Sequence, residues 1–264
     1  MTAAPFFEED DPKDRNFVTA LARGLDVLRC FRENDIELTN TDFAERTGLP
    51  KATVSRLTHT LVKLGYLVVD PDKGTYRLGA GVLELGFSVL SGMDIGARAE
   101  QEMCALRDGP NSYITVAIAE PHGMDVVYVA VQRSREEVAL TMRIGSRLPL
   151  FFSAIGRAIL VGMTDDARAA AMELADRMDP DKRAARLESL AHAKTEFENL
   201  GYCTGYGDWR PDVNGIAVPV FSLNGSRVYG MNVGGPSFHV KKKQLERVYA
   251  KKLIAASERL SIRS

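Results

Sequence analysis

The N-terminal third of the chain carries helix and turn signals in an order that few folds accommodate. From Phe17 to Phe31, apolar residues recur every three or four positions, which is the period of an amphipathic helix. Thr39 followed three residues later by Asp42 predicts a capping box, and so the start of a second, short helix. Gly48 then supplies a turn. Two helices followed by a glycine turn predict the first part of a helix-turn-helix unit.

A third helix and a hairpin complete this segment. Pro50 suits the first turn of a helix that is expected to run to Leu64 and to stop at Gly65. Residues 66–69 and 75–78 then predict two short strands around a turn rich in Asp, Pro and Gly. The order from residue 17 to residue 79 is therefore helix, helix, turn, helix and hairpin, and the hairpin would form a wing.

The predicted third helix has two chemically different faces. On a helical wheel, Val54, Leu57, Leu61 and Leu64 share one side, which is expected to pack on the preceding helices. The other side offers cations and short polar groups, as a helix entering the major groove of DNA requires. The residues predicted to contact DNA are Lys51, Ala52, Thr53, Ser55, Arg56, His59 and Lys63 on this helix and Lys73 at the hairpin tip.

The local charge favours a nucleic-acid partner. Between residues 46 and 69 there are four cations and no acid, although the whole chain has 34 Lys and Arg against 35 Asp and Glu. Cations that neutralise phosphates release counterions and so favour binding to DNA. A solvated amphipathic helix also places its charges outside, so the wheel alone leaves both interpretations open. The helix order, the acid-free stretch and the hairpin together favour DNA binding.

Composition and cysteine usage exclude several other classes of protein. Hydrophobic residues make up 45% and charged residues 26% of the 264 positions, which excludes a disordered chain, a fibre and a coiled-coil rod. Three scattered cysteines without a CxxC motif argue against a disulfide framework and indicate a cytoplasmic protein. No stretch approaches the roughly 20 apolar residues of a membrane helix, and the acidic N-terminus predicts neither a signal peptide nor an anchor.

The residues after the hairpin predict a second domain of the α+β type. Residues 80–108 favour helix with a break near Ser91 and Gly92, and from Tyr113 the period changes to that of strands. We expect strands at 113–119, 126–131, 138–142, 215–221 and 227–233, and helices at 154–162, 165–178, 181–200 and 240–260. The predicted organisation is a solvated tail at 1–16, a winged helix-turn-helix domain at 17–79, a linker helix at 80–95 and a second domain at 96–264.

Several segments, in chain order, are specific enough to indicate a family. They are ALARGLDVLRCF at 20–31, DFAERTGLPKATVSRLTHTLVKLGYL at 42–67, YRLGAGVLELG at 76–86, RIGSRLPLFFSAIGRAIL at 143–160, GIAVPVF at 215–221 and GMNVGGP at 230–236. Together they resemble the isocitrate-lyase-regulator (IclR) family of bacterial transcription factors. The resemblance implies an N-terminal winged helix-turn-helix, a helical linker and a C-terminal GAF-like effector-binding domain, all in a mixed α/β (α+β) chain.

The same resemblance implies partners and a pocket. Members of the family bind a small organic acid in the C-terminal domain and act on palindromic operators as a homodimer or a dimer of dimers. No cofactor and no metal are implied. The residues that match the family's effector pocket are Ala154, Ile155, Gly156, Gly205, Asp208, Gly215, Asn232 and Gly234. The predicted effector-binding set adds Phe152, Arg157 and Trp209 for their chemistry.

The chain departs from the founding member's pattern in this pocket. Gly205 stands for an Asp, Gly215 for a Cys, and Asn232 and Gly234 for two serines. These changes predict a larger and less polar pocket. The segments FFSAIGRAIL, IAVPV and MNV are closer to the branch that controls catabolism of protocatechuate, 4-hydroxybenzoate and related aromatic acids.

An aromatic effector would need a stacking surface and a partner for its carboxylate. Phe151, Phe152 and Trp209 are candidates to stack on the ring, and Arg157 or Arg210 to pair with the carboxylate. Each has an ordinary alternative, because such phenylalanines are often core residues and such arginines often pair with an acid of the protein itself.

Other classes of function compete with this interpretation. An enzyme would need a catalytic signature, and the chain has no HExxH, no GxSxG elbow, no P-loop and no dinucleotide fingerprint. Cys203 as a nucleophile competes with Cys203 as a small buried thiol. A ligand-binding interaction protein without a DNA partner is disfavoured by the polar face of residues 51–63. A short keto acid stays an alternative to the aromatic acid.

Overall fold

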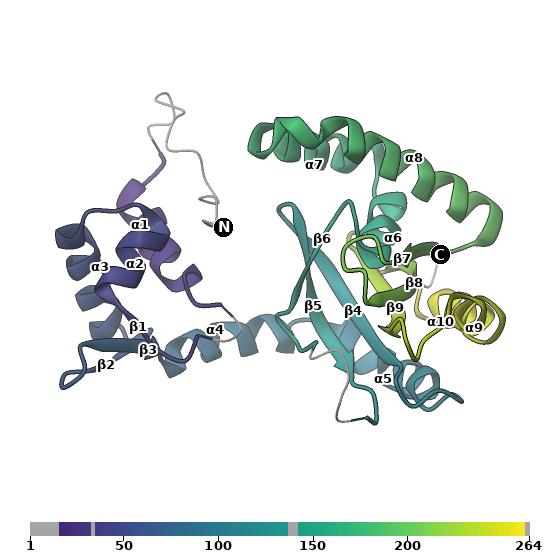
Figure 1. Cartoon of the computed structure of the whole chain (residues 1–264), viewed down its shortest axis with the longest axis horizontal. Coiled ribbons are helices and arrows are strands. Elements are labelled where there is room, and N and C mark those ends of the chain that lie inside the picture. Colours follow the sequence, from purple (N-terminus) through teal and green to yellow (C-terminus); the bar gives the residue numbers. More distant parts are fainter. Residues whose placement is uncertain (1–15, 33–34, 137–141, 262–264) are drawn as a thin grey trace. The chain divides into compact units, whose positions relative to one another are not determined.

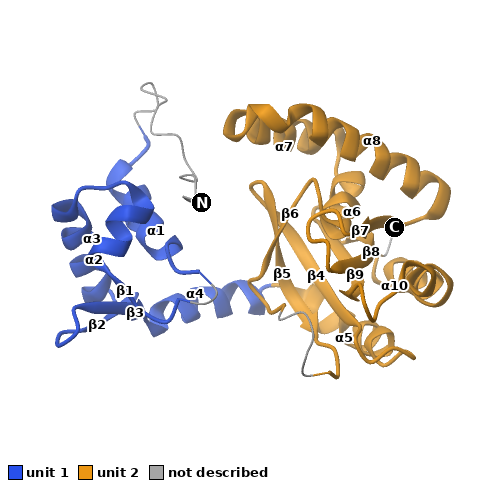
Figure 2. Cartoon of the chain, in the orientation of Figure 1, with its two compact units in different colours: residues 1–92 blue, residues 93–264 orange. Residues whose placement is uncertain are grey.

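The computed structural model describes residues 16–32, 35–136 and 142–261, which form a mixed α/β chain as the sequence predicts (Figure 1). The chain divides into two compact units, Met1–Gly92 and Met93–Ser264 (Figure 2). The predicted tail at 1–16 and the predicted strand at 138–142 lie outside the described residues, apart from Asn16 and Met142, and neither of these two belongs to a strand.

The first unit contains the expected helices and a three-stranded sheet. Its helices are α1 (Thr19–Arg29), α2 (Asn40–Thr47), α3 (Lys51–Lys63) and α4 (Ala80–Ser91), and its strands are β1 (Leu38–Thr39), β2 (Leu67–Asp70) and β3 (Thr75–Leu78). The strands pair antiparallel in the order β1-β3-β2. The two-residue strand β1 was not predicted, because so short a segment has no alternation of its own; it extends the hairpin into a three-stranded wing.

Local chemistry explains the start of α2. The Thr39 hydroxyl accepts from the backbone N–H of Asp42, and the Asp42 carboxylate accepts from that of Thr39, which confirms the predicted capping box. At the other end, Gly48 adopts the left-handed conformation (φ 72°) and closes the helix. Pro50 is the N-cap of α3 rather than its first residue. The positions of both helices are therefore specified by residues at their ends.

The predicted buried face of α3 is wrong at one residue, Leu64. Leu64 is 62% exposed, because it follows the last helical residue, at the point where the chain turns toward Gly65. Thr58 is instead completely buried between Val54 and Leu61. A hydroxyl on this face requires a hydrogen-bond partner, and it was not foreseen from the apolar pattern.

That hydroxyl belongs to a polar chain that orients α3. The Thr58 hydroxyl donates to Oδ1 of Asn40 on α2 (3.1 Å), and Nδ2 of Asn40 donates to the hydroxyl of Tyr76 on β3 (3.3 Å). The ring of Tyr76 in turn lies 5.9 Å from that of Phe43 in the core. These contacts fix the angle of α3 relative to both α2 and the wing.

The wing and α4 meet at a tight junction. The N–H of Gly79 donates to the carbonyl of Tyr66 (2.8 Å), and a Cβ on Gly79 would lie 2.3 Å from the carbonyl oxygen of Gly65. Only glycine fits at this distance, because real Cβ atoms do not approach a backbone oxygen so closely. The first turn of α4 is thus pressed against the turn that ends α3.

The second unit is a six-stranded antiparallel sheet with helices packed on it. Its strands are β4 (Thr115–His122), β5 (Asp125–Gln132), β6 (Arg147–Pro149), β7 (Cys203–Tyr206), β8 (Val213–Phe221) and β9 (Val228–Pro236), in the order β6-β5-β4-β9-β8-β7. Its α-helices are α5 (Asp94–Arg107), α6 (Ala154–Gly162), α7 (Asp165–Met178), α8 (Arg183–Leu200), α9 (Lys242–Gln244) and α10 (Ala250–Leu260). Helix α6 packs on β8 and β9, and α8 packs on α6.

The strands and the last helix differ in part from the prediction. Strands β6 and β7 were not predicted, since β6 is three residues long and β7 is four residues long and contains Gly205. Strand β9 continues to Pro236 through two glycines, which are depleted in strands and so ended the predicted strand at 233. The predicted helix at 240–260 contains a π-helical turn at Leu245–Tyr249. No single helix of the described part of the chain is long and apolar enough to cross a membrane; α4 and α5 meet that criterion of length and composition only when taken together across their break.

Candidate DNA-binding helix and effector pocket

Helix α3 presents the predicted polar residues on its exposed face. Lys51, Ala52, Ser55, Arg56, His59 and Lys63 are exposed, and Thr53 is half-buried at the edge of this face. Val54, Thr58 and Leu61 are buried on the opposite side. The structure therefore brings together the helix residues that the wheel grouped as a DNA-binding surface.

The cations on this face are available to an external partner. Among ion pairs between described residues, none involves Lys51, Arg56 or Lys63. Arg46 differs, because its guanidinium pairs with Asp35 and donates to the carbonyl of Cys30 (2.8 Å). The hydrogen bond from Arg46 lowers the pKa of the Asp35 carboxyl. The acid-free stretch therefore supplies three cations to the surface rather than four.

Lys73 lies at the tip of the wing but shares its charge with acids. The backbone N–H groups of Asp72 and Lys73 donate to the Asp70 carboxylate, which shapes the turn. The Lys73 ammonium lies 3.4 Å from Asp70 and 3.8 Å from Glu37, and its side chain is 64% exposed. This residue can reach a partner, although two carboxylates already offset its charge.

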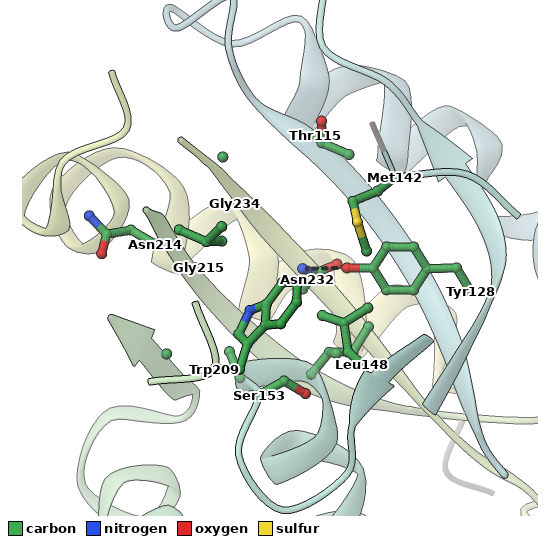
Figure 3. Close-up of a pocket in the computed structure, with 15 residues that line it drawn as sticks. Thr115, Tyr128, Met142, Leu148, Ser153, Trp209, Asn214, Gly215, Asn232 and Gly234 are labelled. Carbon is green, nitrogen blue, oxygen red and sulfur yellow. Dashed lines mark hydrogen bonds between the residues drawn. The ribbon is translucent and has the colours of Figure 1, made fainter. Parts of the chain in front are cut away.

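The second unit contains a pocket of about 460 Å³, part of which is open to solvent (Figure 3). It lies between the N-terminus of α6 and strands β4, β5, β8 and β9. Seven of the predicted effector residues line it: Ala154, Ile155, Gly205, Trp209, Gly215, Asn232 and Gly234. The sequence did not predict the other residues of the wall: Thr115, Tyr128, Met142, Leu148, Ser153, Val213, Asn214 and Gly235.

Strand register explains part of what was missed. Gly234 on β9 pairs with Thr115 on β4 and with Gly215 on β8, so these three residues lie side by side. Asn232, two residues earlier on β9, lies on the same face. Strand pairing would have identified Thr115 as a wall residue, but the sequence does not show which strands are neighbours.

Four predicted effector residues do not line the pocket. Phe152 packs on the hydrophobic core, and Phe151, the other phenylalanine predicted to stack on the ring, is a buried member of that core. Gly156 is pressed against the backbone, because a Cβ there would lie 2.0 Å from the carbonyl oxygen of Leu150. The remaining two, Arg157 and Asp208, are engaged with each other.

Arg157 is buried inside the unit and is not available to a ligand carboxylate. Its Nε donates to the Ser189 hydroxyl (2.9 Å), and its Nη1 donates to the carbonyl of Thr204 (3.0 Å) and to the Asp208 carboxylate. The alternative partner, Arg210, forms a bidentate pair with Asp212. Both predicted carboxylate partners are thus paired with acids of the protein, and no charged side chain lies among the described residues of the wall.

The glycines of the pocket do not all enlarge it. A Cβ on Gly205 would lie 2.9 Å from the backbone nitrogen of Ala154, and one on Gly234 would lie 2.7 Å from the carbonyl oxygen of Asn214. At these two positions glycine permits close packing of the backbone. A Cβ on Gly215 would make only ordinary contacts, at 3.5 Å and beyond. Of these three glycines, only Gly215 leaves room for a ligand.

The pocket is also more polar than expected at one point. Nδ2 of Asn232 donates to the hydroxyl of Tyr128 (3.3 Å), as Figure 3 shows, whereas Oδ1 of Asn232 is buried without a hydrogen-bond partner among the described residues. Burial raises the pKa of the Tyr128 hydroxyl to about 12. Asn232 therefore contributes a polar group to a wall that the sequence comparison predicted to be less polar.

The structure favours neither a nucleophilic cysteine nor a metal site among the described residues. Cys203 is completely buried, and burial raises the pKa of its thiol to about 12, which disfavours a nucleophilic thiolate. Within residues 16–32, 35–136 and 142–261, no three His, Cys, Asp or Glu side chains come together as a metal site.

Comparison with known families agrees with this architecture. The model of the IclR helix-turn-helix domain matches residues 20–71, and that of the bacterial transcriptional regulator IclR C-terminal domain matches residues 87–262. The chain therefore belongs to the IclR family of transcriptional regulators, with a DNA-binding helix-turn-helix and a ligand-binding C-terminal domain.

Named relatives are themselves regulators. The HTH-type transcriptional regulator TsaQ1/TsaQ2 of Comamonas testosteroni is 36% identical over 83% of this chain and 79% of its own. The Pca regulon regulatory protein of Pseudomonas putida is 31% identical over 94% of this chain and 84% of its own.

Solved structures share the fold. An IclR family transcriptional regulator from Brucella abortus has a TM-score of 0.82 and 40% identity, covering 97% of this chain and 96% of its own. An IclR homolog from Microbacterium hydrocarbonoxydans complexed with 4-hydroxybenzoate has a TM-score of 0.65 and covers 90% and 98%; at 22% identity this likeness concerns the fold alone.

The buried Arg157 network predicts a specific loss of stability. Replacing Asp208 with Ala should lower the free energy of unfolding of the second unit by about 1–3 kcal/mol, because a buried guanidinium loses a charged partner. Trp209, the single tryptophan of the chain, reports unfolding of this unit in a urea titration followed by fluorescence. The matched control is Asp165→Ala, since the Asp165 side chain is 95% exposed in its pair with Arg168 and such pairs contribute little. Equal effects of the two substitutions would contradict the structural role of Asp208.

Proposed function

We propose that this IclR regulator is a cytoplasmic protein that reads operator DNA with α3. The observation that carries the proposal is the exposed face of α3, whose cations have no ion-pair partner among the described residues. Arg56 at the centre of this face would contact a guanine, and Lys51, His59 and Lys63 would contact phosphates. Ala52, Thr53 and Ser55 permit close approach to base edges, and Lys73 on the wing would contact the backbone.

The effector we propose is a small aromatic acid. Its ring would pack on Trp209, Met142 and Leu148, all of which line the pocket. The wall offers no cation, so its carboxylate would bind at the N-terminus of α6, where Ala154 and Ile155 line the pocket. The first backbone N–H groups of a helix have no partner within the helix, and the helix dipole favours an anion there.

The oligomer we propose is a homodimer, or a dimer of such dimers, formed through apolar helix surfaces of the first unit. Helix α4 has no buried residue, and Leu83 and Phe87 on one side of it are 74% and 68% exposed. Leu21 of α1 is 64% exposed. Apolar side chains exposed in such number mark an interaction surface, and a second copy of the chain would cover them.

Effector and DNA would be coupled through the two halves of such a dimer. A palindromic operator presents its half-sites about 34–36 Å apart, or a multiple of this. The boundaries we propose are a DNA-binding domain at 17–79, a linker helix at 80–95 and an effector domain at 96–264. Effector binding would shift the population between two arrangements of the two α3 helices in the dimer. The size of this shift is limited by the difference between the effector's affinities for the two arrangements.

DNA recognition is tested by two cations of α3. Arg56→Ala should weaken operator binding by about 1–3 kcal/mol if Arg56 reads a guanine, and should relax specificity at that base pair. Lys63→Ala should reduce the salt dependence of binding by about one phosphate contact. The control is Lys251→Ala, which removes an exposed cation from α10. Wild-type affinity of Arg56→Ala on every operator, or an unaltered slope for Lys63→Ala, would remove that residue from the interface.

The effector class is tested by a thermal-shift screen of small organic acids on the full chain. A ligand at a hundred times its dissociation constant adds about 2.7 kcal/mol to the free energy of unfolding, which gives a clear shift. We expect shifts with aromatic acids and smaller ones in Trp209→Leu, whereas Phe238→Leu, at an exposed position, should respond as the wild type does. A shift confined to short keto acids would replace the aromatic proposal.

Self-association is tested on α4. Leu83→Ser together with Phe87→Ser removes two neighbouring apolar side chains of one helix face, and should weaken the dimer in sedimentation experiments. Leu223→Ser, at a 49% exposed position of the second unit, is the matched control. A double variant that associates as strongly as the wild type would exclude this face as the dimer interface.

A further inference from the structure

We infer that Tyr128 and Asn232 form a reader for a hydroxyl group on the effector, so that the pocket selects hydroxylated aromatic acids over their unsubstituted counterparts. This inference rests on the effector proposed above. It concerns the substituents of the ring, which neither the carboxylate site nor the apolar wall distinguishes.

The first observation is an unsatisfied acceptor. Of the buried side-chain atoms that have no hydrogen-bond partner among the described residues, Oδ1 of Asn232 is the one that belongs to the pocket wall; the others are on Arg107, Asp176 and Arg186. Three other polar side chains of the wall differ from Asn232 in this respect. Ser153, Asn214 and Thr115 each have a partner in the protein. Since a buried acceptor without a partner is costly, a donor from a ligand is the natural partner for Asn232.

The second observation is the neighbouring donor. The hydroxyl of Tyr128 accepts from Nδ2 of Asn232, and its own proton has no acceptor among the described residues. With its pKa raised to about 12 by complete burial, the phenol keeps this proton at neutral pH. The pair thus presents one acceptor and one donor to the pocket.

The sheet holds these two groups together. Asn232 on β9 pairs with Ala117 on β4, and Tyr128 on β5 pairs with Ala119 on the same strand. The small alanine side chains of β4 leave space for the Tyr128 ring to reach across toward Asn232. Tyr128 is 3% exposed and belongs to the core cluster, so its hydroxyl is held in place before a ligand arrives.

The chemistry of the pair selects a hydroxyl. A ligand hydroxyl can donate its proton to Oδ1 of Asn232 and accept from the Tyr128 hydroxyl, so both groups are satisfied. A carboxylate has no proton to donate and would place its negative charge against Oδ1. An unsubstituted ring would leave Oδ1 of Asn232 without a donor and the Tyr128 proton without an acceptor, and sites built to bond a hydroxyl discriminate strongly against ligands that lack it.

The test compares benzoate with 2-, 3- and 4-hydroxybenzoate on the full-length protein, with binding measured by the fluorescence of Trp209 and by calorimetry. We expect at least one hydroxybenzoate to bind tenfold or more tightly than benzoate. Tyr128→Phe and Asn232→Leu should each bring this ratio toward one, mainly by weakening the hydroxylated ligand. Two matched controls should keep the wild-type ratio. Tyr229→Phe changes a buried tyrosine on β9, and Asn199→Leu changes an exposed asparagine on α8.

Each outcome identifies what fails. If benzoate and all three hydroxybenzoates bind equally, the hydroxyl reader is wrong while the aromatic effector stands. If no aromatic acid binds the wild type, the proposed effector class fails and this inference with it. If a hydroxybenzoate is preferred but both variants keep the preference while still binding benzoate, other residues read the hydroxyl and the assignment to Tyr128 and Asn232 is overturned. Two different variants protect the test against a folding defect in either one.

Discussion

The buried guanidinium of Arg157 connects the elements that form the effector pocket, although Arg157 itself does not line the pocket. Arg157 on α6 donates to a hydroxyl of α8, to a carbonyl of β7 and to Asp208 in the following loop. Burying this charge is costly, and the contacts around it compensate for the cost. Because Trp209 is the next residue after Asp208, the same contacts hold the aromatic wall of the pocket beside α6. This charge is neutralised inside the fold, and the described residues of the pocket wall include no charged side chain.

An uncharged wall changes how an anion and a ring can be recognised. For the aromatic acid that we propose, the helix N-terminus would offer backbone dipoles in place of a cation, and Tyr128 and Asn232 would offer neutral polar groups. Recognition by neutral groups depends on matching donors with acceptors rather than on long-range attraction. With the proposed effector, such a pocket would distinguish ligands of equal charge by their substituents.

The sequence predicted features that depend on neighbours in the chain. The capping box at Thr39, the two faces of α3 and the family motifs are local patterns, and the structure or the family comparison confirms them, except that Leu64 is exposed and Thr58 is buried. Pairs far apart in sequence were not predicted. Arg157 and Asp208 are 51 residues apart, and Asn232 and Tyr128 are 104 apart. A glycine aligned with a larger residue does not show whether it opens space, as at Gly215, or permits packing, as at Gly205.

The junction between the wing and α4 has a consequence for building hybrid regulators. Gly79 fits only because it lacks a side chain where it meets the carbonyl oxygen of Gly65, and the N–H of Gly81 donates to that same oxygen. The turn after α3 and the first turn of α4 therefore form one rigid piece of backbone. A chimera that joins this DNA-reading unit to a foreign sensor should be cut within α4, beyond Gly81, because a cut between the wing and the helix would separate parts that support each other.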